Sequence, residues 1–454
     1  MSAEPLVRSC VPGIVWPGIA TAAGAQMLSL QWQLEKSQWW SPECLRDFQL
    51  RQLRTLIAHA TAHVPHYHGA LHRAGIDSAS SLDSASFSRW PVLRKRDVRQ
   101  NELALRASAL PGTHGVVTES RTTGSTGTPV RVYRTSLEAS FMRALVLRNH
   151  LLHGRDMRLK FGALRAGVET GEQQGWGVAS TVFETGPSCA VSLYAPLEEQ
   201  FDWLLRERPA YLISTPLALR ELVLLSRRRA IRPDGLVAVM TFAAMQPADL
   251  RELVRETWKI PVTDTYSCVE AGTLAIQCPG HDHYLVQAEN VFLEVLREDG
   301  SACCMGETGR VVITPLHNFA MPLIRYELGD YAEVGAPCPS GRGLPTLARI
   351  AGRVRNLFRY PTGERRSPNV PPDVWLETPI VQYRLLQRTV KSIEVQYVME
   401  RPLSGAEKAG LAKRLAGSLG YPFEVSFVRK EWIERGPGGK YEEFLCLVPE
   451  APDE

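Results

Sequence analysis

The chain contains the segment Arg121-Thr122-Thr123-Gly124-Ser125-Thr126-Gly127-Thr128-Pro129, in which every residue after Arg121 is Thr, Ser, Gly or Pro. The two glycines give the backbone conformations that other residues rarely adopt, so successive N–H groups can converge on an anion. The hydroxyls add donors for phosphate oxygens. The segment has neither the lysine nor the spacing of the P-loop of ordinary NTPases. It therefore predicts either a phosphate-binding loop of another kind or a solvated turn.

Four later segments also combine reactive side chains with turns. They are Thr265-Tyr266-Ser267-Cys268-Val269-Glu270-Ala271-Gly272, Pro322-Leu323-Ile324-Arg325-Tyr326-Glu327-Leu328-Gly329-Asp330, Arg349-Ile350-Ala351-Gly352-Arg353 and Arg435-Gly436-Pro437-Gly438-Gly439-Lys440. In a functional interpretation, the carboxylate of Asp330 accepts hydrogen bonds from sugar hydroxyls, and Lys440 supplies a cation on a glycine-rich loop. The structural alternatives are a strand end, a turn aspartate, a surface arginine and a loop between strands.

In their order and separation, these five segments resemble the adenylate-forming superfamily of acyl-CoA synthetases, peptide-synthetase adenylation domains and luciferases. The nearer similarity is to the phenylacetate–CoA ligase branch and its capsule-biosynthesis-type relatives. Segments 34–43, 56–60 and 91–95 are similar to that branch as well. The resemblance therefore covers roughly residues 30 to 445.

The resemblance implies a role for each candidate residue. Residues Thr122, Thr123, Gly124, Ser125, Thr126 and Gly127 would wrap the β- and γ-phosphates of ATP. Tyr266 would lie against the adenine, and Ser267 near the α-phosphate or the substrate carboxylate. Glu270 would hold Mg²⁺.

The other three segments, which contain Asp330, Arg353 and Lys440, would complete the nucleotide site. Asp330 would bind the ribose hydroxyls, and Arg353 would support the ribose or phosphate side. Lys440 would reach the α-phosphate and the attacking carboxylate oxygen. In this superfamily a small second domain rotates and withdraws that lysine after adenylation, a hinge-type change.

The implied reaction activates a carboxylic acid with ATP as an acyl-adenylate and releases pyrophosphate. A carboxylate that attacks the α-phosphorus brings two anions together, so the site must supply positive charge there. The acyl group then passes to coenzyme A. A stand-alone carrier protein or an amine is the alternative acceptor, and a nucleotide-binding scaffold without turnover is a further alternative.

The chain departs from the superfamily pattern at three places. Val130 stands where a lysine is common, and Arg131 or Arg134 could supply that charge instead. Segment 241–244 lacks the usual Gly-Glu, and 355–356 occupy the hinge position as Arg-Asn.

By resemblance, segment 160–165, Phe242 and Met245 lie near the acyl pocket. Aromatic and small residues there suit an aryl or compact acid. The acid itself cannot be identified from the sequence.

Cys278, His283 and Cys338 form a candidate zinc site, since thiolates and imidazoles are the ligands that Zn²⁺ prefers. Members of the phenylacetate branch often carry a later Cys-x-Cys, and this chain has Ser340 where the second of those cysteines would be. His281 or water would be the fourth ligand. The alternative is free cysteines and surface histidines.

The 454 residues correspond to two or three domains at roughly 150 residues each. Helix-like patterns at 137–152, 196–206, 217–229 and 247–258 alternate with short apolar runs at 211–214, 236–240, 291–295 and 310–313. This alternation predicts an α/β fold.

We expect a large N-terminal adenylation domain of stacked β-sheets flanked by helices over 1–354, whose first 110 residues are mostly helical. A small mobile α+β domain over 355–454 would carry Lys440, with strands at 393–398 and 423–428 and a helix at 405–419. Segments 78–88 and 335–352 are expected to be irregular.

The composition excludes several classes of protein. Apolar residues make up 44% and charged residues 22%, as in globular proteins, and 52 basic against 48 acidic residues leave only +4. No nucleic-acid partner is therefore expected. No run of about 18 apolar residues predicts a membrane span. The nine cysteines form no regular framework, and no signal-peptide pattern occurs, so we expect a cytoplasmic protein.

Overall fold

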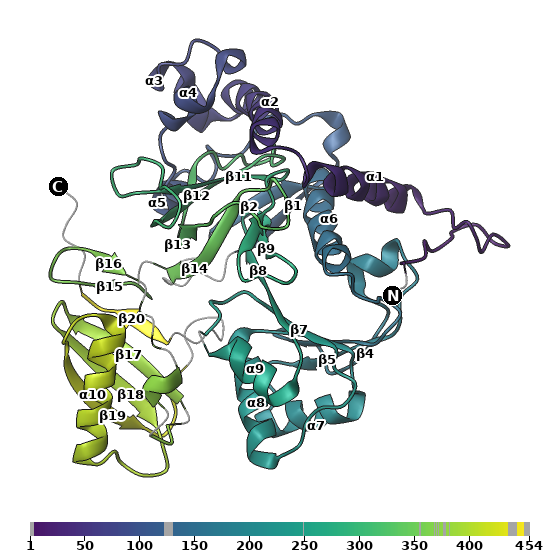
Figure 1. The fold of residues 1–454 in the computed structure, drawn as a ribbon. Helices are drawn as coiled ribbons and strands as arrows, with labels where there is room; N and C mark the ends of the chain where they lie inside the picture. The colour runs from purple at the N-terminus through teal and green to yellow at the C-terminus, as the bar shows by residue number, and fades with distance from the viewer. Residues whose placement is uncertain are drawn as a thin grey trace.

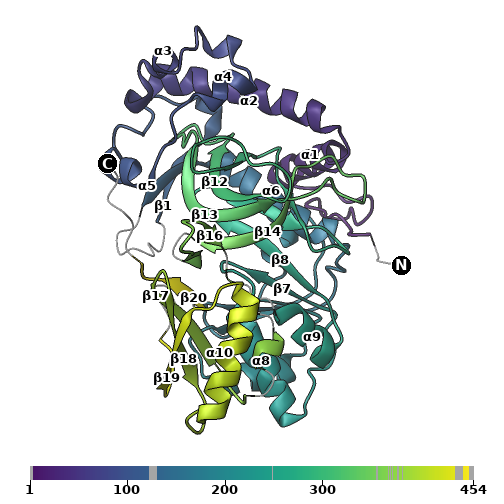
Figure 2. The same ribbon diagram turned by 60° about the vertical axis from the view of Figure 1, so that its left-hand side comes forward.

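The computed structural model describes residues 4–121, 130–247, 249–353, 356–366, 368, 370, 372–375, 378–380, 382–434 and 443–448. The predicted phosphate-binding residues 122–127 and Lys440 lie outside them, and so does the side chain of Arg353. Figures 1 and 2 show a large sheet region and, beside it, a smaller C-terminal sheet.

Helices dominate the first hundred residues. They are α1 (Ala22–Ser37), α2 (Pro42–His63), α3 (Ala70–Arg73), α4 (Ser84–Ser88) and α5 (Lys95–Gln100), with 3-10 turns η1 (Pro65–Tyr67), η2 (Ala79–Ser81) and η3 (Gly112–His114). The expectation of a loop over 78–88 was wrong. Asp83 caps α4 by accepting a hydrogen bond from the N–H of Ser86, which stabilises this short helix.

Helix α2 shows why this region folds locally. The Ser41 hydroxyl accepts a hydrogen bond from the N–H of Cys44, and Pro42 occupies the first turn, where its missing N–H costs nothing. Leu53, Leu56 and Ile57 are fully buried on the inner face. The helix therefore packs onto the large sheet through one apolar stripe.

Twelve strands form the large sheet, in the order β11-β12-β13-β14-β10-β9-β8-β7-β6-β3-β5-β4. Their bounds are β3 (Phe161–Arg165), β4 (Gly171–Gln173), β5 (Ser188–Ser192), β6 (Tyr211–Ser214), β7 (Ala238–Phe242), β8 (Val262–Cys268), β9 (Gly272–Gln277), β10 (Tyr284–Val286), β11 (Val291–Leu296), β12 (Thr308–Pro315), β13 (Tyr326–Val334) and β14 (Thr346–Arg353). We expected stacked sheets, but these strands are joined edge to edge in a single sheet. The regular strand β14 also corrects the expectation that 335–352 is irregular throughout.

One half of this sheet is parallel. Strands β3, β5, β6, β7 and β8 run in the same direction. Helices α7 (Leu197–Glu207), α8 (Pro216–Arg229) and α9 (Leu250–Trp258) cover one face and share a buried core with these strands. These helices lie close to the predicted segments, although α9 begins three residues later than expected.

The other half, from β9 to β14, is antiparallel. Its core includes the inner face of α2 and the buried Tyr326. Helix α6 (Ser136–Leu152) and the 3-10 turn η4 (Gly177–Thr181) lie over the junction of the two halves and contact α1 and β9. The sheet thus changes from parallel to antiparallel between β8 and β9, at the Tyr266–Gly272 motif.

A separate hairpin flanks the hydroxyl-rich segment. Strand β1 (Val117–Arg121) pairs antiparallel with β2 (Arg131–Thr135), and Arg121 lies opposite Arg131. The hairpin leads directly into α6, whose first turn is capped by the Thr135 hydroxyl. Arg121 and Arg131, which lie before and after the predicted phosphate-binding segment, are therefore adjacent.

The C-terminal region forms a four-stranded sheet in the order β19-β18-β17-β20. Its strands are β17 (Gln382–Thr389), β18 (Ser392–Val398), β19 (Glu424–Lys430) and β20 (Phe444–Cys446), preceded by β15 (Phe358–Arg359), β16 (Arg365–Arg366) and the 3-10 turn η6 (Pro372–Trp375). Helix α10 (Gly405–Leu419) begins with a Ser404–Glu407 capping box and ends at Gly420 in the left-handed conformation. Its buried leucines pack onto this sheet.

The predicted α/β fold is confirmed, with a large sheet flanked by helices and a smaller C-terminal sheet. No helix in the described part of the chain combines the length and apolarity that a bilayer crossing requires.

Candidate active site

The Tyr266–Gly272 motif forms the turn between β8 and β9, where the large sheet changes direction. Gly272 has φ +72°, and a Cβ there would lie 2.6 Å from Cε of Met142. A side chain at this position would therefore be strained and would clash with α6. Glycine lets α6 pack against the turn that carries Ser267 and Glu270.

Tyr266 and Asp330 lie together although 64 residues separate them. The Tyr266 hydroxyl donates a hydrogen bond to Oδ2 of Asp330 at 2.9 Å. Tyr266 is buried, and burial together with the Asp330 charge raises the pKa of the phenol. The phenol therefore stays protonated and keeps the partly buried carboxylate in place.

Glu270 is buried at 5% exposure. The Tyr326 hydroxyl donates to its Oε1 at 3.2 Å, and a guanidinium nitrogen of Arg134 donates to the carbonyl of the preceding residue, Val269. No hydrogen bond from another described residue reaches the second carboxylate oxygen. Two contacts from other elements thus orient Glu270 and leave an oxygen available for a cation.

Arg134 on β2 and Glu138 on α6 are both buried, near enough for their charges to interact. Burial raises the pKa of Glu138 to about 8, and the charge of Arg134 opposes that rise. Nε of Arg134 and Oε2 of Glu138 are buried without a hydrogen-bond partner among the described residues. Arg131, by contrast, is exposed at the hairpin rim, 3.9 Å from Glu102. Of the two arginines predicted to replace the missing lysine, Arg134 is the one that contacts the motif.

Arg353 lies opposite Asp330 in the ladder between β13 and β14. The backbone of the Arg349–Arg353 motif is thus adjacent to Asp330, the residue predicted to bind the ribose. Ser267 lies opposite Thr273 in the β8–β9 hairpin and is partly buried. The roles of these residues toward ATP stay predictions.

Glu443 lies three residues after Lys440 in the sequence and is buried near the helices of the parallel half. Burial raises its pKa to about 7, with the nearby charge of Arg220 opposing the rise and that of Asp249 adding to it. Arg220 and Asp249, on α8 and at the start of α9, form an ion pair at 2.7 Å. Residue 443 is therefore close to α8 and α9.

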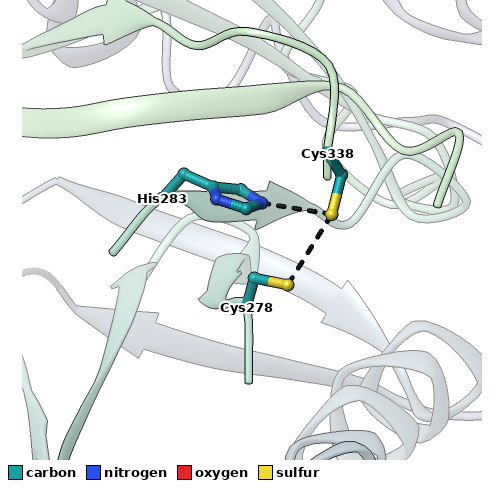
Figure 3. Close-up of side chains that lie close together, drawn as sticks. All are labelled: Cys278, His283 and Cys338. Carbon is teal, nitrogen blue, oxygen red and sulfur yellow. Dashed lines mark hydrogen bonds between the residues drawn. The ribbon is translucent and has the colours of Figure 1, made fainter. Parts of the chain in front are cut away.

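The predicted zinc ligands converge in space (Figure 3). Sγ of Cys278 lies 3.7 Å from Sγ of Cys338, and Nε2 of His283 lies 3.2 Å from that same sulfur. All three ligand atoms lie within 4.8 Å of one another. Oγ of Ser340 is 2.9 Å from Cys338 Sγ, so the serine that replaces the family's cysteine is also at the cluster.

Sequence reasoning missed Tyr326, Glu138 and Glu443. Tyr326 lies within the Pro322–Asp330 motif, in which only Asp330 was predicted to have a functional role. Buried acids such as Glu138 and Glu443 leave no sequence signal, because their burial depends on elements far away in the chain.

No model of a known protein family matches the chain. It is 25% identical to a phenylacetate–coenzyme A ligase of Thermus thermophilus over 89% of its own length and 97% of that protein's. It is 24% identical to the phenylacetate–coenzyme A ligase of Aromatoleum evansii, over 76% and 80% of the two chains. The predicted resemblance to the phenylacetate–CoA ligase-like branch is confirmed.

Among solved structures, the fold is similar to 2-hydroxyisobutyryl-CoA ligase in its postadenylation state with an acyl-AMP. The TM-score is 0.72 at 18% identity, over 91% of this chain and 92% of that one. Against the same ligase in its thioesterification state the TM-score falls to 0.58.

Proposed function

We propose that this relative of the phenylacetate–CoA ligases is an AMP-forming acid–CoA ligase. It activates a small carboxylic acid with ATP, releases pyrophosphate and passes the acyl group to CoA. The convergence of Tyr266, Asp330 and Glu270 at the β8–β9 turn carries the proposal. Similarity to phenylacetate–CoA ligases over nearly the whole chain supports it.

In this proposal Asp330 accepts hydrogen bonds from the ribose hydroxyls, and Tyr266 holds its carboxylate in position. A fixed acceptor loses less side-chain entropy when the nucleotide binds. An oxygen of the substrate carboxylate attacks the α-phosphorus, and the bond to pyrophosphate breaks. Lys440 supplies positive charge at the oxygens where negative charge accumulates.

Glu270 fits a magnesium ligand, because Mg²⁺ prefers carboxylate oxygens and one oxygen of this oriented carboxylate has no described partner. Bound Mg²⁺ would neutralise phosphate charge. Tyr326 would keep Glu270 in one rotamer by its hydrogen bond, and Arg134 would fix the backbone just before it.

The test is acid-dependent release of pyrophosphate from ATP, with and without CoA, over a panel of aryl and short aliphatic acids. We expect release only with an acid, and thioester formation when CoA is present. Release that is independent of CoA, with transfer to an amine or a carrier protein, would identify the alternative acceptor. If no acid in the panel supports release while ATP still binds, the chain is a nucleotide-binding scaffold.

Lys440→Ala tests the chemical step. We expect acyl-AMP formation to fall by about 100- to 1,000-fold, as when one charge-stabilising donor is removed from an active site. The affinity for ATP should change little. Lys430→Ala, an exposed lysine on β19, is the matched control. Equal losses of ATP binding and chemistry in Lys440→Ala would contradict its assignment.

We also propose that Cys278, His283 and Cys338 bind Zn²⁺. Zinc–sulfur bonds of about 2.3 Å in a tetrahedron place two sulfurs about 3.8 Å apart. The observed 3.7 Å supports such a site. Ser340 Oγ, His281 or water would supply the fourth ligand.

Metal analysis of the purified protein should find about one zinc per chain. Cys338→Ser should abolish it, whereas Cys303→Ser, outside the cluster, should not. A metal-free wild-type chain with two reactive thiols at Cys278 and Cys338 would contradict the proposal.

A further inference from the structure

Arg165 stands at the carboxyl end of β3, within the parallel half of the large sheet. From β8 to β3 the strand order is β8-β7-β6-β3, so the ends of β8, β7 and β6 lie beside it. In α/β sheets, ligands bind at the carboxyl ends of parallel strands. Arg165 therefore lies at the same edge of the sheet as the Tyr266–Gly272 motif.

The guanidinium of Arg165 has no acidic partner among the described residues. Its guanidinium carbon lies over the ring of Phe242, 5.2 Å from the ring centroid. Neighbouring basic residues do have acids: Arg158 pairs with Asp156 at 2.8 Å, and Lys160 with Glu207 at 2.7 Å. The charge of Arg165 is thus available to a ligand or to a group outside the described part of the chain.

The side chain of Arg165 is exposed, so an anion from solvent can reach it. Surrounding protein nevertheless lowers the pKa of its guanidinium by partial desolvation. An anion that reaches a partly desolvated cation is bound more strongly than one beside a fully hydrated cation.

One neighbour of Arg165 is suited to an aromatic ring. Phe242, at the end of β7, offers an aromatic face beside the guanidinium. His150 adds no charge, because burial keeps its pKa well below the usual value.

The spacing of the strands limits the size of the ligand. Three strand spacings separate β3 from β8, which is about 14 Å. The arginine side chain spans part of this distance. What remains suits an acid about the size of one benzene ring with a functional group at each end.

We propose that Arg165 binds a second carboxylate on the acid substrate, so that this ligase activates a compact aromatic dicarboxylic acid. This inference rests on the proposed function and names its substrate class. One carboxylate is adenylated, while the other stays ionised in a charge-assisted pair with Arg165, and Phe242 packs beside the ring.

The experiment compares two matched acids, benzene-1,4-dicarboxylate and 4-methylbenzoate, which differ in the distal group. Pyrophosphate release is measured with the wild type, Arg165→Met and Arg165→Lys. We expect kcat/KM of the wild type to favour the dicarboxylate by about 100-fold, the size expected for a desolvated charge pair. Arg165→Met should lose this preference through the dicarboxylate alone, mainly in KM, and Arg165→Lys should retain part of it. Arg158→Met, an equal loss of charge at an exposed ion pair, should behave like the wild type.

Other results are equally decisive. A wild type that prefers 4-methylbenzoate, or an Arg165→Met variant that loses both acids equally, overturns the inference and leaves the ligase function intact. If neither acid releases pyrophosphate, calorimetric titration with the dicarboxylate decides. Binding that requires Arg165 supports the inference while the proposed function fails for these acids, and absence of binding overturns it.

Discussion

Each half of the large sheet holds an arginine, and the two arginines differ in how their donors are used. In the antiparallel half, Arg325 is 3% exposed and bonds Glu294 with two nitrogens, at 2.9 and 3.0 Å, and the carbonyls of Ser88 and Trp90. At the carboxyl edge of the parallel half, Arg165 is exposed, lies over the Phe242 ring and has no acidic partner among the described residues. An arginine whose donors are satisfied within the fold stabilises it, whereas an exposed one without an acidic partner is available to a ligand.

The largest effect should follow from replacing Arg325, whose donors are bonded within the fold. Arg325→Ala leaves Glu294 as a buried, unpaired carboxylate, so we expect the free energy of unfolding to fall by about 3–5 kcal/mol. Chemical denaturation followed by tryptophan fluorescence measures this. Arg165→Met should unfold at nearly the wild-type denaturant concentration. If Arg165→Met were as destabilising as Arg325→Ala, the distinction between the two halves would fail.

Near the helices of the parallel half, the C-terminal region adds a buried acid, Glu443. Burial raises the pKa of Glu443 from 4.5 to about 7. The folded chain therefore holds this proton over a pH range in which the unfolded chain has released it. The contribution to stability is fully present below pH 4.5 and is lost as the pH rises through 7.

Glu443→Gln should remove that pH dependence. We expect the wild type to lose on the order of 3 kcal/mol relative to the variant between pH 4.5 and pH 8. Thermal unfolding at several pH values provides the measurement, with Glu424→Gln, an exposed glutamate on β19, as control. Parallel pH curves for wild type and Glu443→Gln would show that Glu443 keeps an ordinary pKa.

The hydrogen bond between Tyr266 and Asp330 should have a smaller, functional effect. Tyr266→Phe keeps the ring but removes the donor to a charged acceptor, a loss of about 1.5 kcal/mol. In the proposed ligase this should raise KM for ATP by roughly tenfold and leave kcat nearly unchanged. Tyr331→Phe is a matched control, because its hydroxyl bonds Glu298. A fall in kcat alone would place Tyr266 in the chemical step instead.

The smallest effect is expected at a surface pair. Arg349 bonds Glu333 at 2.7 Å on the same antiparallel half, but its side chain is 48% exposed. We expect Arg349→Ala to cost less than about 1 kcal/mol, since solvent screens such pairs. A larger loss, measured by the same denaturation, would mean that burial does not explain the importance of Arg325.

Local rules predicted much of the secondary structure. Ser404 and Glu407 predict the start of α10 through their capping geometry, and alternating apolar residues predict β18. Segment 78–88 was mistaken for a loop because its serines favour turns, whereas the Asp83 cap stabilises a short helix there.

The candidate site was only partly predictable. The order of the motifs indicated Tyr266, Glu270 and Asp330, but not that Tyr266 bonds Asp330 or that Arg134 reaches Val269. These contacts join residues far apart in the chain, so they depend on strand order and register. The lack of an acidic partner for Arg165 among the described residues is likewise a property of the assembled sheet, because strand order decides which side chains lie beside it.

The ladder pair between Asp330 and Arg353 has a mechanical consequence. Strand β14 ends at that pair, and the chain then leaves the large sheet for the C-terminal one. If the C-terminal region rotates about this point, as the family resemblance predicts, the pivot lies next to the carboxylate that we assign to the ribose. Lys440 would then move away while Asp330 stays in place, so the acyl-adenylate would remain bound during the rotation.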